Sequence, residues 1–321
     1  MAGFLKQQFP ECRITFLVRA YAQAVAGRCC FVDSVITLES LHDPVAQLTA
    51  GNFDVALFAF PHRKLAQAAK RAKIRWRVGT GHRLYHWLYC NKLAHFSRVN
   101  SSLHEAQLNF ALLKPLGIEV TPGLSQITGW YGLTSPANGG APSPALSRPE
   151  RFRNNCFNLI LHPKSNGNGR EWPAGHYLEL ARQLQDHPAI RLWISGSQHE
   201  GEQLAQAVPA LFALPNVTSL CGQCTLAQFT DLIAASDGLI ASGTGPLHMA
   251  ASLDRRTLGL FPPLKPIDIA RWGAVGSRAE NMCKPQACPG CPGAQDCACM
   301  AALTVEQVKG VVLGWAGKPN D

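Results

Sequence analysis

The sequence predicts an α/β protein made of two parallel β-sheets with helices on both faces. Two runs of alternating strand-like and helix-like segments support this prediction, one over residues 13–117 and one over residues 157–261. Strands that alternate with helices favour a parallel sheet, because a crossover segment must join parallel strands. Between the two runs, residues 121–149 are rich in Gly, Pro and Ser, which is typical of a linker or a long surface loop.

In the first run, apolar segments bounded by turn residues predict strands, and longer periodic segments predict helices. The expected strands are residues 13–18, 34–37, 54–58 and 74–78. The expected helices are residues 62–73 and 102–116, and Gly117 supplies the usual stop after the second.

The same signals recur in the second run. The expected strands are residues 157–161, 190–194, 239–241 and 257–261, and the expected helices are residues 173–184, 200–208, 225–235 and a segment that opens at Pro246. Proline suits the first turn of a helix, because the N–H group that it lacks would have no partner there. In such a domain, ligands bind at the carboxyl ends of the strands.

The chain of 321 residues is long enough for two domains. We expect an N-terminal domain at residues 1–135, a linker at residues 136–153 and a C-terminal domain at residues 154–321. No apolar run reaches the roughly 18 residues that a membrane span requires, and the first ten residues do not form a signal peptide. We therefore expect a cytoplasmic protein whose twelve cysteines are reduced.

The net charge of +9 is concentrated in one stretch of the chain. Residues 62–83 hold eight basic residues and no Asp or Glu: Arg63, Lys64, Lys70, Arg71, Lys73, Arg75, Arg77 and Arg83. Such a cluster favours an anionic partner, namely nucleic acid, a phosphorylated glycolipid or a membrane surface; the plain alternative is a solvated helix face. Because no nucleic-acid-binding motif accompanies the charge, we do not expect nucleic acid as the partner.

The turn Ser242-Gly-Thr-Gly245, between a strand and the helix opening at Pro246, is the clearest candidate binding site. The free N–H groups of a helix N-terminus attract phosphate. Thr244 can cap the helix or donate its hydroxyl to the anion, and His248 lies one turn further on. A structural turn without a ligand is the alternative.

A second polar loop, residues 162–173, follows the first strand of the C-terminal domain and should lie at the same edge of the sheet. Its Ser165, its glycine backbone and Arg170 are suited to hold a diphosphate, although an ordinary loop would have this composition too. After the next strand, Glu200 is the first choice for a ribose diol and Glu202 the second. A plain acid at a helix start is an equal interpretation of Glu200.

Taken together and in this order, these motifs resemble those of glycosyltransferase family 9, the heptosyltransferases of lipopolysaccharide core synthesis. The similarity extends over nearly the whole chain. It rests on Arg170-Glu-Trp-Pro173, Ser195-Gly-Ser-Gln-His-Glu200, Ser242-Gly-Thr-Gly-Pro-Leu-His-Met-Ala-Ala251, Leu260-Phe-Pro-Pro263, Arg271-Trp-Gly-Ala-Val-Gly276 and Leu303-Thr-Val-Glu-Gln-Val308. The resemblance implies a GT-B fold, with two Rossmann-like domains facing a cleft. It also implies inverting transfer of heptose from ADP-heptose to the inner core of lipopolysaccharide, without a cofactor.

The resemblance further assigns roles to individual residues. The donor diphosphate would lie at Thr244, Gly245 and Pro246 with His248 nearby, Arg170 would replace a family Lys, and Glu200 would take the ribose. The basic residues Arg63, Lys64 and Arg83 would meet the anionic acceptor, and the protein would touch the inner face of the inner membrane peripherally.

The sequence departs from the family pattern in two places. Gly243 stands where the family turn has Asp, which leaves another sugar nucleotide open as the donor. The first family strand and a Gly-Asp turn, whose Asp the family uses as general base, have no counterpart here, so we expect that base upstream of Met1. The alternative is a catalytically impaired relative. In a doubly wound sheet that strand is central, so its absence should leave two open strand edges. As substitute bases, His62, His82 and His104 are weaker candidates.

The cysteine-rich tail offers a structural zinc site as an alternative to a plain loop, with Cys288, Cys291, Cys297 and Cys299 as ligands. We expect no metal, because the spacing fits a standard finger poorly. No Asp-x-Asp pair occurs in the sequence, which argues against a metal-bridged nucleotide-sugar site. Charge on a departing diphosphate would instead be met by a helix dipole and cations.

Overall fold

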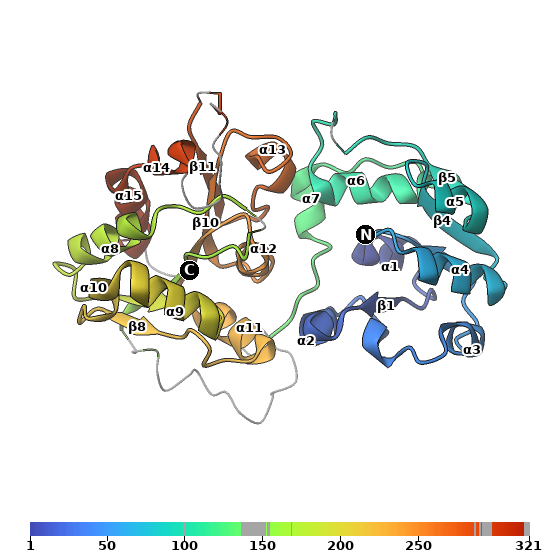
Figure 1. Ribbon diagram of the computed structural model, residues 1–321, viewed down its shortest axis with the longest axis horizontal. Helices are drawn as coiled ribbons and strands as arrows, with labels where there is room; N and C mark the ends of the chain where they lie inside the picture. The colour runs from blue at the N-terminus through green and yellow to red at the C-terminus, as the bar shows by residue number, and fades with distance from the viewer. Residues whose placement is uncertain are drawn as a thin grey trace. The chain divides into compact units, whose positions relative to one another are not determined.

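The computed structural model describes residues 1–98, 100–135, 152, 155–167, 169–285, 287–288, 290 and 297–317. The chain divides into two compact units, Met1–Trp130 and Tyr131–Asp321, which we call unit 1 and unit 2. Figure 1 draws unit 1 from blue to green and unit 2 from light green to red. Apart from Phe152, the predicted linker at residues 136–153 lies outside the described residues.

Unit 2 is built on one six-stranded sheet with the order β11-β10-β9-β6-β7-β8, in which all neighbours are parallel. Its strands are β6 (Phe157–His162), β7 (Ile190–Ile194), β8 (Val217–Ser219), β9 (Gly238–Ser242), β10 (Arg256–Phe261) and β11 (Ala279–Cys283). The chain runs from β6 outward to β8 and then returns to the other side of β6 with β9. In open α/β sheets, ligands commonly bind at such a reversal of strand order. In unit 2 the reversal lies between β6 and β9.

Several helices of unit 2 begin at residues whose side chains cap the first turn. The helices are α8 (Ala174–Gln183), α9 (Gln198–Ala207), α10 (Pro209–Phe212), α11 (Leu226–Ala235), α12 (Gly245–Ser252), α13 (Ile269–Trp272), α14 (Ala298–Ala301) and α15 (Val305–Ala316). Ser197, Thr225 and Thr304 form capping boxes at α9, α11 and α15, each with a Glu or Gln three residues later. All residues of β9 and β10 are buried, as expected for central parallel strands covered on both faces.

Unit 1 contains two separate parallel sheets, β1-β2 and β3-β4-β5. The strands are β1 (Thr15–Val18), β2 (Ser34–Thr37), β3 (Val55–Leu57), β4 (Trp76–Thr80) and β5 (Lys92–Ala94). No residue of β1, β2 or β3 is fully buried, in contrast to the central strands of unit 2. Among the described residues, the two sheets share no hydrogen-bonded strands, which agrees with the expectation of open edges.

The helices of unit 1 are short. The α-helices are α1 (Ala2–Gln8), α2 (Gln23–Ala26), α3 (Pro44–Ala50), α4 (Arg63–Arg71), α5 (Leu84–Tyr89), α6 (Glu105–Leu108) and α7 (Leu124–Thr128). The 3₁₀ turns are η1 (Ala20–Ala22), η2 (Leu38–Ser40), η3 (Asn109–Leu112) and η4 (Lys114–Leu116). The prediction of one helix over residues 102–116 is wrong, because that segment is α6 followed by η3 and η4. Pro115 lies at the start of η4, where the N–H group that it lacks would have no partner. Within the described ranges, no helix combines the length and the apolar character needed to cross a membrane.

Candidate functional site

Two loops meet where β6 and β9 end. The strands are neighbours, with His162 opposite Ala241, so the chain leaves both at the same edge of the sheet. A Cβ atom placed on Gly169 in the first loop would lie 3.6 Å from the carbonyl oxygen of Gly243 in the second. The predicted proximity of the two loops is therefore confirmed, and it falls at the reversal of strand order.

The second loop leads into α12 with an N-cap residue that does not cap. Thr244 has the extended backbone of an N-cap, yet its side chain accepts no hydrogen bond from the helix. Its Oγ1 is shielded from solvent and has no hydrogen-bond partner among the described residues, and the same holds for Oγ of the buried Ser242. Buried hydroxyls are normally paired. A ligand oxygen at the start of α12 would supply the missing acceptor for Thr244, beside the free N–H groups of the first turn.

Two glycines shape this turn in different ways. A Cβ atom on Gly243 would approach Cε1 of Phe261 to 2.8 Å, so the neighbouring ring excludes a side chain there. A Cβ atom on Gly245 would meet no atom within 4 Å. Gly245 therefore faces open space at the helix start, directly before Pro246.

The first loop is fixed by a buried carboxylate that sequence reasoning missed. Oε1 of Glu171 accepts hydrogen bonds from the backbone N (2.9 Å) and Oγ (3.1 Å) of Ser165, and Oε2 accepts one from Nζ of Lys164 (2.6 Å). Oγ of Ser165 also lies 2.9 Å from the carbonyl oxygen of Gly169, which it can donate to. The hydroxyl proton of Ser165 is thus donated within the loop. This contact supports a structural role for Ser165, which was predicted to hold the diphosphate. Arg170 follows directly and is half-buried.

His162 is the last residue of β6 and directly precedes the first loop. Oγ of Ser195 donates to the carbonyl oxygen of Leu161, so Nδ1 of His162, 3.0 Å from that Oγ, acts as the donor to it. Desolvation lowers the pKa of His162 to about 4, although Glu200 and Glu171 act in the opposite direction. The ring is therefore neutral at pH 7 and leaves Nε2 as an acceptor. The signal available in the sequence was its position at the carboxyl end of a buried strand.

Glu200 caps its own helix. Its Oε2 accepts from the backbone N (2.7 Å) and Oγ (2.9 Å) of Ser197, which completes the capping box of α9. Its Oε1 accepts no hydrogen bond from the described residues, so a ribose diol could still bind there. Glu202 is more exposed and its Oε1 accepts from Nε2 of Gln198, which makes it the weaker candidate.

The remaining donor-site candidate on α12 is His248. Its ring is half-buried, with its centroid 6.3 Å from that of Trp272 on α13. Asp268 caps α13 by accepting a hydrogen bond from the backbone N of Arg271 (3.1 Å). The contact between His248 and Trp272 places the Arg271-Trp-Gly motif beside α12.

The predicted acceptor residues belong to unit 1. Arg63 and Lys64 open α4, Arg83 precedes α5, and all three side chains are exposed. They lie after β3 and β4, at the carboxyl ends of two neighbouring strands.

Of the three histidines considered as substitute bases, two serve as helix caps. Nδ1 of His62 accepts from the backbone N of Leu65 (3.2 Å), and Nδ1 of His104 accepts from that of Ala106 (3.1 Å). In His82 the contact is between Nε2 and the carbonyl oxygen of Phe96 (2.6 Å), so Nε2 carries the proton and Nδ1 keeps its lone pair.

The proposed zinc ligands cannot be assembled from the part of the chain that the structure describes. Cys291 lies outside it, and no group of three or more His, Cys, Asp or Glu side chains within it could hold a metal ion. Cys297 and Cys299 are buried in the core of unit 2 beside Met300, and Cys288 packs against the same core.

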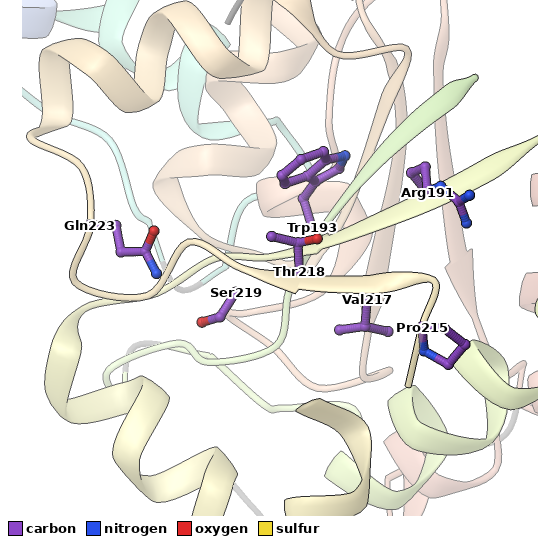
Figure 2. Close-up of a pocket in the computed structure, with 7 residues that line it drawn as sticks. All are labelled: Arg191, Trp193, Pro215, Val217, Thr218, Ser219 and Gln223. Carbon is purple, nitrogen blue, oxygen red and sulfur yellow. The ribbon is translucent and has the colours of Figure 1, made fainter. Parts of the chain in front are cut away.

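A separate hollow of about 630 Å³ runs along β7 and β8. Figure 2 shows its residues in a row, with Gln223 at one end and Arg191 and Pro215 at the other. Trp193 forms its wall, and the Trp193 ring contacts Phe152 at a centroid distance of 4.8 Å. None of the predicted donor residues lines this hollow, so it is distinct from the site at β6 and β9.

Comparisons with known proteins agree with this arrangement. The sequence pattern of glycosyltransferase family 9 (heptosyltransferase) matches residues 45–298. A Haemophilus influenzae protein, named as a glycosyltransferase without a substrate, is 22% identical over 88% of this chain and 84% of its own length. Lipopolysaccharide heptosyltransferase 2 of Salmonella typhimurium is 32% identical over 31% of this chain and 29% of its own.

Solved structures show the same fold. The E. coli ADP-heptose lipopolysaccharide heptosyltransferase II has a TM-score of 0.67 at 18% identity, over 98% of this chain and 92% of its own. The family 9 glycosyltransferase of Veillonella parvula has a TM-score of 0.69 at 15% identity, over 98% of this chain and 91% of its own. These matches identify the fold class as GT-B, and the pattern match covers most of the chain. The chain belongs to glycosyltransferase family 9.

Proposed function

We propose that this glycosyltransferase transfers heptose from an ADP-activated donor to the inner core of lipopolysaccharide. The observation that carries the proposal is the hydroxyl of Thr244, shielded and unpartnered among the described residues, at the start of α12. Two comparisons support the donor and the acceptor: the Salmonella relative named above is a lipopolysaccharide heptosyltransferase, and an E. coli heptosyltransferase of the same fold was solved with ADP.

In this proposal the diphosphate of the donor lies against the first turn of α12. Thr244 donates to a phosphate oxygen, and the N–H groups near Gly245 and Pro246 provide positive potential. Arg170, on the neighbouring loop, offsets the charge that builds up on the departing ADP. The acceptor hydroxyl attacks the anomeric carbon from the opposite side, so the configuration inverts.

The nucleoside would extend from α12 across the end of β6 toward α9. Oε1 of Glu200 is free of hydrogen bonds from described residues and would accept from a ribose hydroxyl. The neutral His162 below it can accept a hydrogen bond at Nε2 without adding positive charge beside the ribose.

On the acceptor side, exposed Arg63, Lys64 and Arg83 supply positive charge for an anionic core. The resemblance assigns proton removal to an Asp in a turn that this sequence does not contain. We expect this Asp upstream of Met1. His82 is a weaker candidate, whose Nδ1 is not used by a helix cap, unlike that of His62 or His104.

A second candidate function is sugar-nucleotide binding without transfer. The observation that favours it is that no residue of the strands β1, β2 and β3 in unit 1 is fully buried. This candidate shares the donor site, so both candidates predict ADP binding at α12.

The test measures ADP binding by calorimetry and heptose transfer from ADP-heptose to a purified truncated core acceptor. Gly245→Ala is the informative variant, because its methyl group meets no protein atom yet enters the space before α12. The matched control is Gly314→Ala in α15, where a Cβ atom also meets nothing within 4 Å. We expect ADP affinity to fall at least about tenfold for Gly245→Ala only, a change of about 1.4 kcal/mol. Equal affinity of both variants and the parent chain would refute the donor site, and ADP binding without transfer would favour the second candidate.

A further inference from the structure

The outward face of α5 carries three large apolar side chains in water. Leu84 is 87% exposed, Trp87 60% and Leu88 63%. They are spaced three and four residues apart, which places them on one side of the helix. An exposed cluster of this kind, with an aromatic residue among aliphatic ones, marks an interaction surface.

The opposite side of α5 holds the helix in place. His86 is fully buried, its Nδ1 lies 3.0 Å from the carbonyl oxygen of Thr80, and its ring contacts those of Phe58 and Tyr85. Nε1 of Trp87 donates to the carbonyl oxygen of Gly81 (3.0 Å), so its ring is held outside with its own N–H satisfied. The apolar face is therefore a built feature of the fold and is presented to solvent in a fixed orientation.

The apolar face belongs to a segment of the chain that is rich in positive charge. The helices α4 and α5 pack against one another (Figure 1), and Nζ of Lys70 donates to the carbonyl oxygen of Leu88 (2.8 Å) at the end of α5. Other exposed cations of the segment are Arg63, Lys64, Arg71, Lys73, Arg75 and Arg83. Residues 55–104 contain no Asp or Glu, and the next acid, Glu105, is paired with Arg98. We call Leu84, Trp87, Leu88 and these cations, Lys70 included, the α4–α5 surface.

We propose that the α4–α5 surface docks onto an anionic lipid bilayer, with Leu84, Trp87 and Leu88 entering the headgroup region. Three properties match this partner. Tryptophan prefers the membrane interface, aliphatic side chains gain from insertion below it, and Lys and Arg are attracted to anionic headgroups. A nucleic acid would use the cations but would leave an aliphatic pair such as Leu84 and Leu88 without a partner, whereas a bilayer accommodates both.

The inference deepens the proposed function and rests on it in one respect. A lipid-anchored acceptor lies at a bilayer, so docking there would bring the basic residues after β3 and β4 to its anionic core. Lipid binding itself needs neither donor nor acceptor, so it can be measured alone.

The test is flotation of the full chain with vesicles of phosphatidylethanolamine and phosphatidylglycerol, compared with vesicles of phosphatidylcholine. The apolar variant is Trp87→Ser with Leu88→Ser, and its control is Tyr21→Ser, which removes a 75% exposed aromatic elsewhere. The charge variant is Arg71→Gln with Arg75→Gln, and its control is Lys114→Gln with Lys265→Gln, both exposed.

We expect the parent chain to bind the anionic vesicles and to release them as salt rises. Each surface variant should bind about tenfold more weakly, and both controls should bind like the parent chain. Melting temperatures check that the variants fold. If the variant with Trp87→Ser and Leu88→Ser does not fold, the single variant Leu84→Ser takes its place. Unchanged vesicle binding by the apolar variant, or equal binding to phosphatidylcholine, would overturn the proposal. The proposal would also be overturned if the parent chain bound a single-stranded RNA but did not bind the vesicles.

ADP calorimetry on the same samples separates the two proposals. Vesicle binding without ADP binding would refute the donor site alone, and ADP binding without vesicle binding would refute the docking surface alone.

Discussion

The ring of Phe261 lies against Gly243, in the turn between β9 and α12, and leaves no room for a side chain there. A Cβ atom on Gly243 would lie 2.8 Å from Cε1 of Phe261, closer than two carbon atoms can stand without movement. Phe261 is 1% exposed at the end of β10, and its ring also lies 2.5 Å from a Cβ built on Gly259. The aromatic ring thus occupies the place beside the turn that a longer residue at position 243 would need.

The first prediction follows from this contact. Gly243→Asp should destabilise the protein by about 1–3 kcal/mol, because the side chain must displace a packed ring. In a protein that already carries Phe261→Leu, Gly243→Asp should cost at least about 1 kcal/mol less. The reason is that the free-energy effects of substitutions at two residues in contact do not simply add. Urea unfolding of the four proteins measures this difference. If the unfolding free-energy changes of the two single variants simply add up to that of the double variant, the ring of Phe261 does not limit which residues fit at position 243.

The second prediction concerns the hydroxyl of Thr244. Thr244→Val removes no capping bond, so the free energy of unfolding should stay within about 0.5 kcal/mol of the parent value. ADP affinity should nevertheless fall about tenfold, since a charge-assisted hydrogen bond to phosphate is lost. Thr225→Val is the matched control, because Thr225 does cap α11. It should lose about 1 kcal/mol of stability and keep its ADP affinity. The reverse pattern would contradict the geometry described for α12.

The third prediction concerns the loop carboxylate. Glu171→Gln leaves Nζ of Lys164 without its charge partner in a largely buried position, and such losses cost about 3–5 kcal/mol. Lys164→Met with Glu171→Leu removes both charges and should be much less destabilising than Glu171→Gln. Thermal and urea unfolding measure the stability of these variants. If Glu171→Gln is as stable as the parent chain, the ion pair of Lys164 with Glu171 does not hold the loop in place.

These residues also show what the sequence could predict. The turn at Thr244 and its proximity to the loop after β6 followed from local patterns and parallel-sheet geometry, which relate each strand end to its neighbour. Glu171 did not, because its partners at Lys164 and Ser165 depend on how the loop folds back on itself. The pairing of Gly243 with Phe261 joins two strands, and nothing local marks it.

Unit 1 illustrates a different limit. Its strands were found because short apolar runs bounded by turns are readable, but β5 was not, since Lys92–Ala94 is too short to show a pattern. The apolar periodicity of residues 102–116 predicts one helix, whereas the segment is α6 followed by η3 and η4. The apolar residues Leu84, Trp87 and Leu88 carry no signal in the sequence that separates them from core residues, and the structure shows that they are exposed.

The fourth prediction is a loss of stability in acid that depends on His162. An unfolded histidine has a pKa near 6.5, whereas desolvation holds the folded value at about 4. Between these values the unfolded chain binds a proton that the folded chain does not, so the free energy of unfolding falls as pH drops from about 6.5 to 4. The loss is at most about 3 kcal/mol, and it is smaller to the extent that water reaches the partly buried ring. His162→Gln keeps a donor for Oγ of Ser195 and should remove this part of the pH dependence. His199→Gln, on the exposed start of α9, should leave it unchanged. Urea unfolding at pH 7, 6, 5 and 4.5 measures all three proteins, and an identical slope in His162→Gln and the parent chain would mean that another group titrates.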